Sequence, residues 1–346
     1  MRKNALLLMA ALAIGFQSQA TIRRVNNTPG VNSVYASLHT AITEANPGDT
    51  IHIEGSAFYY GTPSISKKLV FIGPGYFHTD TAANPNTQAN KLSAYVDMVF
   101  GPGSKGSVVQ GMSLNQVVVS DSFITIQRNV ITGTIYLANA GHSYGDTIRH
   151  NFMDNGGISN GSAAYEAKGV FIYNNIIVKG NGTFMNTSVL ANANGFFINN
   201  SMTTIGNNTI SMNVQNFTFQ NNLFAKVDFG ASQNANIFLN NIAKVGIPVG
   251  NNNVLNVDPV DLFVGWNSPG TSTYSTDARY KLKAGSPALN AGIMNGSPVD
   301  CGAFGGPAPY ILSGMPPVPS VYLLTMPNQI NSGTPSINVT VSAASH

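Results

Sequence analysis

Side chains able to do acid–base chemistry gather between residues 121 and 173, at similar positions relative to a repeated asparagine. The basic and aromatic members come one or two places before the asparagine of their own repeat: Arg128, Arg149, His150 and Tyr173. The others come five to nine places before it: Asp121, His142, Asp146, Glu166 and Lys168. A cation, an imidazole and a carboxylate that share one groove can transfer protons or hold a polar ligand.

This grouping does not by itself identify a site. An error of one residue in strand register turns a side chain to the opposite face of a sheet. The chain has only 14 acidic residues, and they form no tight aspartate cluster of the kind that holds Ca²⁺. We therefore interpret the group first as solvated polar side chains on a surface. The candidates for catalysis are Asp146, Arg149, His150, Glu166 and Lys168.

A repeated phrase indicates the architecture that positions these residues. It reads apolar, any, any, Asn, any, apolar, and it covers residues 126–131, 148–153, 172–177 and 219–224. Its asparagines are Asn129, Asn151, Asn175 and Asn222, and Asn241 continues the series. Steps of 22 and 24 between the first three are typical of a solenoid, in which each repeat stacks on the last. The register over 196–210 stays open, because a second copy of the phrase begins at Ile205; we place Ser201 in the asparagine slot.

The beginning of the chain predicts export. Arg2 and Lys3, an apolar run over 5–16 and small residues at Ser18 and Ala20 have the order of a signal peptide over residues 1–20. We expect a mature bacterial protein that is secreted or held at the cell surface, with no membrane span after cleavage. Cys301 is the only cysteine, so no internal disulfide can form, and we expect a buried, inert thiol.

The charge balance restricts the class of partner. Charged residues make up 9% of the chain, and the formal net charge is +3. A nucleic-acid partner would require clustered lysine and arginine, which the sequence lacks. Uncharged polar residues must therefore provide most of the hydrated surface.

The first coils carry a family resemblance. A helical pattern over about 35–46 ends at the Asn-Pro-Gly of 46–48, and strands follow at 49–53 and 64–73. This run, from SLHTAITEANPGDTIHIEG to ISKKLVFIGPG, resembles the opening of right-handed parallel β-helix proteins of the pectate-lyase-like superfamily. The resemblance implies an all-β solenoid over 21–306 whose N-terminal helix caps the first coil.

The repeated asparagines have a structural explanation in such a fold. Each coil is a set of short parallel strands joined by bends, and asparagine tolerates the left-handed backbone conformation that a tight bend needs. Repeated at one bend, its amides can also hydrogen-bond from coil to coil. We predict that the ladder consists of Asn129, Asn151, Asn175, Asn222 and Asn241, and that the apolar residues of the phrase point inward.

The C-terminal part resembles the same group at its closing motif. Residues 280–292 (YKLKAGSPALNAG) and 300–306 (DCGAFGG) are similar to the last coil of many β-helix proteins of Bacteroidota type. Asn290 and Cys301 depart from the residues usual there. Five prolines over 307–319 predict an extended linker. Apolar strands at 320–325 and 336–341 predict a C-terminal β-hairpin within 320–346 that packs on the coil, where it could close the last one.

Three functions remain open from the sequence. We favour a secreted or surface-associated scaffold that binds glycans or other surface polymers without catalysis, because a β-helix offers long faces for sugar hydroxyls. The binding candidates are Arg128, Arg149, Tyr173 and Trp266. The resemblance raises a second function, a polysaccharide lyase or glycoside hydrolase acting on acidic polysaccharides. The third is a structural envelope component that binds protein partners. We expect no cofactor, and Ca²⁺ would enter only with a lyase. The oligomeric state is not set by the sequence.

Overall fold

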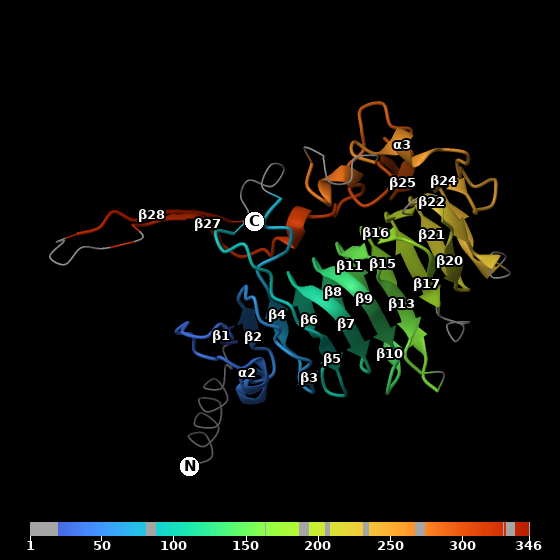
Figure 1. Ribbon diagram of the computed structural model, residues 1–346. Helices are drawn as coiled ribbons and strands as arrows, with labels where there is room; N and C mark the ends of the chain where they lie inside the picture. Colours follow the sequence, from blue (N-terminus) through green and yellow to red (C-terminus); the bar gives the residue numbers. More distant parts are fainter. Residues whose placement is uncertain are drawn as a thin grey trace, which may run out of the picture.

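Parallel strands stacked coil on coil form the body of the protein (Figure 1). The computed structural model describes residues 20–80, 88–162, 164–186, 194–204, 208–230, 235–266, 274–327, 329 and 336–345. Residues 1–19 of the predicted signal peptide, and 205–207 of the second copy of the phrase, lie outside them. Successive coils pair in parallel and cross over in the same sense, so the predicted right-handed parallel β-helix is confirmed.

The first large sheet, sheet A, holds ten short strands, one from each successive coil. In order across the sheet they are β1 (Ile22–Val25), β2 (Thr50–Ile53), β4 (Val70–Ile72), β6 (Val108–Gln110), β8 (Thr125–Gln127), β11 (Thr147–Arg149), β15 (Phe171–Tyr173), β18 (Gly195–Ile198), β21 (Phe217–Gln220) and β23 (Ile237–Leu239). Ile126, Ile148 and Ile172 are in register and fully buried inside the coil. Because side chains alternate along a strand, the residues on either side of each face outward.

The second large sheet, sheet B, holds twelve strands and forms the rest of the coil wall. They are β3 (Ser64–Ile65), β5 (Met98–Phe100), β7 (Ser113–Val119), β9 (Val130–Leu137), β12 (Phe152–Asp154), β13 (Gly157–Asn160), β16 (Ile176–Lys179), β17 (Gly182–Asn186), β19 (Ser201–Thr204), β20 (Ile210–Asn213), β22 (Leu223–Asp228) and β24 (Ile242–Val245). The long strand β9 pairs with both β12 and β13 of the next coil. A separate parallel pair, β10 (Ser143–Tyr144) and β14 (Ala167–Lys168), lies at the bend that leads back into sheet A.

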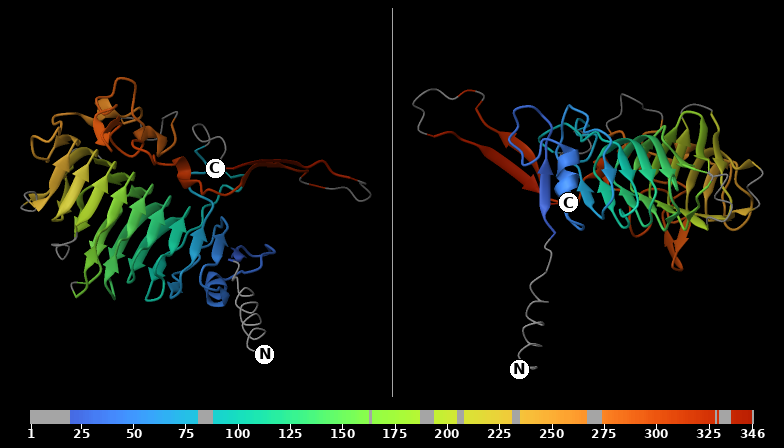
Figure 2. Two further views of the ribbon diagram at one scale, coloured as in Figure 1. Left: turned by 180° about the vertical axis from the view of Figure 1, so that it is seen from behind. Right: turned by 90° about the horizontal axis from the view of Figure 1, so that it is seen from below.

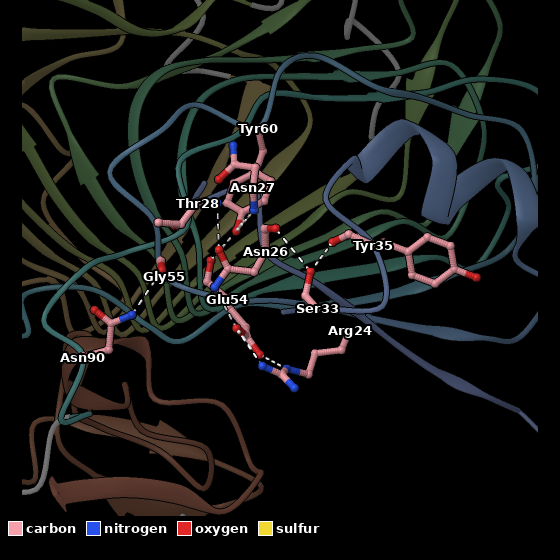
Figure 3. Close-up of polar contacts among 10 residues, drawn as sticks. All are labelled: Arg24, Asn26, Asn27, Thr28, Ser33, Tyr35, Glu54, Gly55, Tyr60 and Asn90. Carbon is pink, nitrogen blue, oxygen red and sulfur yellow. Dashed lines mark hydrogen bonds and ion pairs between the residues drawn. The ribbon is translucent and has the colours of Figure 1, made fainter. Parts of the chain in front are cut away.

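The N-terminal end of the stack is covered as the sequence predicts. Helix α2 (Leu38–Glu44) is shorter than the predicted span, and it buries Leu38, Ala41 and Ile42 against the first coil. Its N-cap is Ser37, whose Oγ accepts the Thr40 N–H at 3.3 Å. Polar contacts hold the loops around this end (Figure 3): Asn26 Nδ2 donates to Glu54 Oε2 at 2.8 Å, and Arg24 pairs with Glu54.

The chain turns back after the last coil and lies along the outside of the stack. This part begins with α3 (Pro259–Leu262), a 3₁₀ turn over Ala278–Tyr280 and the hairpin of β25 (Gly292–Met294) with β26 (Ser297–Val299). We call residues 300–315, which include a second 3₁₀ turn (Leu312–Gly314), the return segment. Its residues meet coils in reverse order: Cys301 lies against Asn240, Gly302 against Asn221, Gly305 against Asn174, Ala308 against His150 and Met315 against Arg128.

The return segment changes two expectations. Residues 300–306 do not finish a coil, because they lie against the bends of earlier coils. The first part of the predicted linker is not a free connector either, since Tyr310, Ser313 and Met315 are buried. It covers a second apolar cluster on the outside of the coil, made by the residue after the ladder asparagine in five coils: Val130, Phe152, Ile176, Leu223 and Ile242.

The C-terminal strands β27 (Ser320–Thr325) and β28 (Thr340–Ala344) pair antiparallel, but they do not pack on the last coil. They project from the body beside the first coils, as both views of Figure 2 show. Their base is held where the Ala89 N–H donates to the Val321 carbonyl at 2.8 Å. The expectation that the hairpin closes the last coil is therefore wrong.

Candidate functional site

An uninterrupted asparagine ladder runs inside the bend between sheets A and B. The Oδ1 of Asn151 accepts both the backbone N–H and the Nδ2–H of Asn129, at 3.0 and 3.2 Å, while its own Nδ2 donates to Ile126 O at 2.9 Å. The same pattern continues coil by coil through Asn175, Asn200, Asn222, Asn241 and Asn253. The interior rungs are fully buried, so they support the coil and are not available to a ligand.

The register around the fourth rung differs from the prediction by one residue. Asn200, not Ser201, occupies the ladder position, because it comes three places after the inward-facing Phe197. Ser201 begins β19, and its Oγ accepts the Ala303 N–H of the return segment at 2.9 Å. Asn253, beyond the last predicted rung, was not recognised because it follows Asn241 after only twelve residues.

The left-handed residue of the bend is the one before the ladder asparagine, not the asparagine itself. The seven residues in this position have φ between 52° and 57°: Arg128, His150, Asn174, Asn199, Asn221, Asn240 and Asn252. The ladder side chain must point inward to reach the next rung, so its neighbour makes the sharp turn. Arg128 and His150 are exceptional, because residues with bulky side chains hold this conformation only when contacts compensate for the strain.

The compensating contacts of Arg128 and His150 go to the return segment. Arg128 Nη1 donates to Met315 O at 3.0 Å, and His150 Nε2 donates to Ala308 O at 2.8 Å. Burial lowers the pKa of His150 to about 4, so its imidazole is neutral near pH 7. Both side chains are engaged under the return segment, and neither the ligand role of Arg128 nor the catalytic role of His150 fits this position.

The remaining catalytic candidates do not converge either. Asp146 is fully buried in a bend, where it accepts the Ile124 N–H at 2.8 Å and the Ser143 hydroxyl; burial raises its pKa to about 7. Glu166 and Lys168 form an exposed ion pair at 2.6 Å near the β10–β14 bend. Arg149 faces outward on sheet A. The five candidates therefore occupy four different environments: a buried bend, an exposed bend, the outer face of sheet A and the position under the return segment.

The described residues do not fit a Ca²⁺ site. No group of three or more His, Cys, Asp or Glu side chains among them is arranged to hold a metal ion. The carboxylates nearest the predicted stripe are already occupied by protein donors, as Asp121 shows by accepting the N–H groups of Gly103 and Lys105. Ca²⁺ takes six to eight oxygen ligands, which these carboxylates cannot supply.

Arg149 and Tyr173 belong to a hydrogen-bonded row on the outer face of sheet A. We call this row of Gln110, Gln127, Arg149 and Tyr173 the Arg149 row; they are direct register partners in four successive coils. Arg149 Nε donates to Gln127 Oε1 at 2.6 Å, and its Nη1 donates to Tyr173 Oη at 2.8 Å. Gln127 Nε2 donates to Gln110 Oε1 at 2.8 Å. The row is therefore held in one arrangement before any ligand arrives.

An exposed aromatic pair lies beside the Arg149 row and was not predicted. Phe171 and Phe196 are register partners in β15 and β18, and they stack with centroids 5.1 Å apart and planes at 10°. Their exposed fractions are 41% and 36%. Phe171 precedes Tyr173 by two residues, so both project from the same face. The sequence signal was an aromatic residue at the first outward place of two adjacent strands, which only the correct coil register brings together.

A second aromatic column lies at the bend that leads into sheet A. Phe123 and Tyr144 are adjacent there, since the Phe123 N–H donates to Tyr144 O at 2.8 Å, and Tyr144 is the register partner of Lys168. Lys105 Nζ lies 5.0 Å from the centroid of Phe123. His142 stacks on Tyr144 with centroids 5.9 Å apart. Phe123 and Tyr144 are both exposed.

Trp266 lies elsewhere, in the C-terminal part of the chain. It packs beside Phe263 at a centroid distance of 6.2 Å and is partly buried in the cluster outside the coil. Of the four binding candidates, Arg149 and Tyr173 contact each other directly, whereas Trp266 packs in this cluster.

The fold and this face define the class of protein: a parallel β-helix with a preformed polar row and exposed aromatic rings on one flat sheet. No family model matches the chain, and no curated protein matches it. Among solved structures it is similar to pectate lyase Pel9A, with a TM-score of 0.43 and 14% identity over 84% of this chain and 98% of that one. That degree of similarity is too low to carry a function from one protein to the other.

Proposed function

We propose that this protein is exported and binds glycan chains, without modifying them, on the outer face of sheet A between β8 and β18. The observation that carries the proposal is the exposed, stacked Phe171–Phe196 pair beside the Arg149 row. Aromatic faces pack against the apolar faces of sugar rings, and nearby amide, guanidinium and phenol groups bond their hydroxyls.

The rigidity of this face favours binding. Both aromatic residues come from strands inside a continuous ten-stranded sheet, and the neighbouring row is already hydrogen-bonded. Little side-chain entropy is then lost when a ligand is bound. Outward threonines at Thr125, Thr147 and Thr218 extend the polar surface in register with the aromatic pair. No helix within the described ranges is long and apolar enough to cross a bilayer.

The enzymatic and protein-scaffold hypotheses have less support. A lyase or hydrolase would need its acid and base within reach of one bond, and the five candidates occupy separate environments. A structural envelope component would leave the aromatic pair without a sugar ligand. An enzyme would release a modified sugar product, and a protein scaffold would bind no glycan, so both differ from the proposal in the same experiment.

The test is binding to an array of neutral and acidic glycans by the mature protein, followed by titration of the best ligand. Replacing Phe171 or Phe196 by alanine should raise the dissociation constant about twofold to twelvefold, because each ring contributes roughly 0.5–1.5 kcal/mol. Phe58→Ala is the matched control, since Phe58 is also exposed but lies near the first coil. Equal affinity of all three variants, or no bound glycan, would contradict the proposal. Ultraviolet absorbance from an unsaturated sugar, with or without Ca²⁺, would instead establish a lyase.

A further inference from the structure

The C-terminal hairpin has one apolar face that the described part of its own chain leaves exposed. We call residues 320–345 the arm. Leu324 pairs directly with Val341, and Val321 pairs with Ala343, so these four side chains share a face. A bulge between Val321 and Leu323 is what brings positions three apart to the same side.

The opposite face of the arm is more polar, although it carries Leu323, which is 44% exposed. Thr325 pairs with Thr340, and Leu323 pairs with Ser342. The alternation continues towards the tip in the sequence, where Ile337 and Val339 precede Val341 at steps of two. The ribbon is therefore amphipathic in the manner of a strand pair that packs on another sheet.

The apolar face of the arm is exposed to solvent. Leu324 is 51% exposed and Val341 is 57% exposed, although both are large aliphatic residues. Figures 1 and 2 show the arm pointing away from the coils, with only its base near the body. Ser320 is buried at that base, so the arm leaves the body from a fixed point. A two-stranded hairpin in water is marginally stable unless its apolar face is packed.

The chemistry of the arm selects its partner. Residues 307–345 contain no Asp, Glu, Lys or Arg. Proteins that bind lipid surfaces place basic residues beside the apolar ones, and this segment has none. A glycan would need aromatic platforms, and Tyr322 is the only aromatic residue in the arm. A charged protein surface would lose hydration on this face without gaining a counter-charge.

The arm of a second copy of this chain is a partner without charge and with the same aliphatic face. It is uncharged, aliphatic and flat, so two copies can pack face to face about a two-fold axis without charge repulsion. We propose that this protein forms a dimer in which the apolar faces of two arms pack into a four-stranded sandwich. The dimer holds two β-helices at the ends of their arms and leaves sheet A of each copy open, and it does not depend on glycan binding.

The test is the molar mass of the mature, full-length protein by light scattering over a wide range of concentration. Wild type should have the mass of two chains and dissociate on dilution. Val341→Glu should raise the dimer dissociation constant at least tenfold, while Thr340→Glu, the adjacent residue on the polar face, should leave it unchanged. Melting temperatures of both variants should match wild type, because the arm lies outside the core.

A cross-link tests the geometry directly. In oxidising buffer, Ala343→Cys on the apolar face should join two chains, whereas Ser342→Cys on the polar face should not. Cys301 is buried and does not compete. Any of three results would overturn the proposal: a single-chain mass at every concentration, equal weakening by both glutamate variants, or a monomer that binds uncharged phospholipid vesicles through the arm.

Discussion

At the residue scale, neighbouring positions of the bend have separate roles. The ladder asparagine turns inward and satisfies backbone groups of two coils, while the residue before it adopts the left-handed conformation. Where that residue is Asn174, its Nδ2 donates to Ala303 O and Gly305 O, at 2.9 and 2.8 Å. His150 and Arg128 reach the same segment with longer side chains. In the coils of Arg128, His150 and Asn174, one position therefore both makes the turn and anchors the return segment.

His150 gives this position a pH dependence. Burial lowers its pKa to about 4. Between pH 6.5 and 4 the unfolded chain therefore takes up a proton that the folded chain does not, and stability present above pH 6.5 is lost as the pH falls. His150→Gln keeps a donor for Ala308 O but cannot be protonated. As the pH falls from 6.5 to 4, the free energy of unfolding of the variant should rise relative to that of wild type by up to about 3 kcal/mol.

The measurement is the free energy of unfolding in denaturant at several pH values from 7 to 4. The raised pKa of Asp146 acts in the opposite sense, but it is common to both proteins and cancels in the difference. His39→Gln, on the exposed side of α2, is the control and should leave the free energy of unfolding unchanged. If the unfolding free energies of wild type and His150→Gln change in parallel with pH, protonation of His150 does not destabilise the folded protein.

At the element scale, the ladder joins coils that are otherwise held by short strands. Asn175 accepts from the backbone N–H of Asn151 at 2.9 Å and donates to Ile148 O at 2.9 Å. Asn175→Leu removes these bonds and leaves both backbone groups buried without their partner. Each such group costs about 1–3 kcal/mol, so the variant should lose about 2–6 kcal/mol of unfolding free energy.

Chemical denaturation of Asn175→Leu beside Asn115→Leu measures this effect. Asn115 is exposed, so its replacement should change stability by less than about 0.5 kcal/mol. If Asn175→Leu loses no more unfolding free energy than Asn115→Leu, the hydrogen bonds of the ladder amides do not stabilise the folded protein.

Sequence periodicity predicted the elements that repeat and missed those that do not. The inward apolar residues and five ladder asparagines recur with the coil, so local patterns identify them. The fourth rung was placed at Ser201 because Ile198 also fits the first apolar position of the phrase, whereas Phe197 is the inward residue and Asn200 follows it by three. The return segment has no period, and its contacts join residues more than a hundred positions apart. The Phe171–Phe196 pair likewise exists only through long-range register.

At the scale of the whole molecule, the return segment links coils that a simple solenoid keeps independent. Each repeat of a solenoid contacts only its neighbours, so its ends can unfold separately. Here one segment crosses from the coil of Asn240 to that of Arg128 and then reaches the loop after β4. There the Tyr310 and Tyr76 hydroxyls lie 2.5 Å apart, and the Ser313 N–H donates to the buried carboxylate of Asp277 at 2.6 Å. The protein should therefore unfold in one cooperative transition.

Gly314→Val tests this coupling at the far end of the return segment. Gly314 has φ near 56°, and a Cβ there would lie 2.2 Å from Tyr76 Cε1 and 2.4 Å from Arg128 O. Gly296→Val is the matched control, because its φ is also positive, at 77°, but a Cβ there meets nothing within 4 Å. Both variants bear the backbone strain of a β-branched residue, about 1–3 kcal/mol. Only Gly314→Val should also speed amide hydrogen exchange over 303–315. It should split the calorimetric transition in two as well, because coils released from the return segment can unfold separately. Identical behaviour of the two variants would show that the coils are coupled through their own stacking alone.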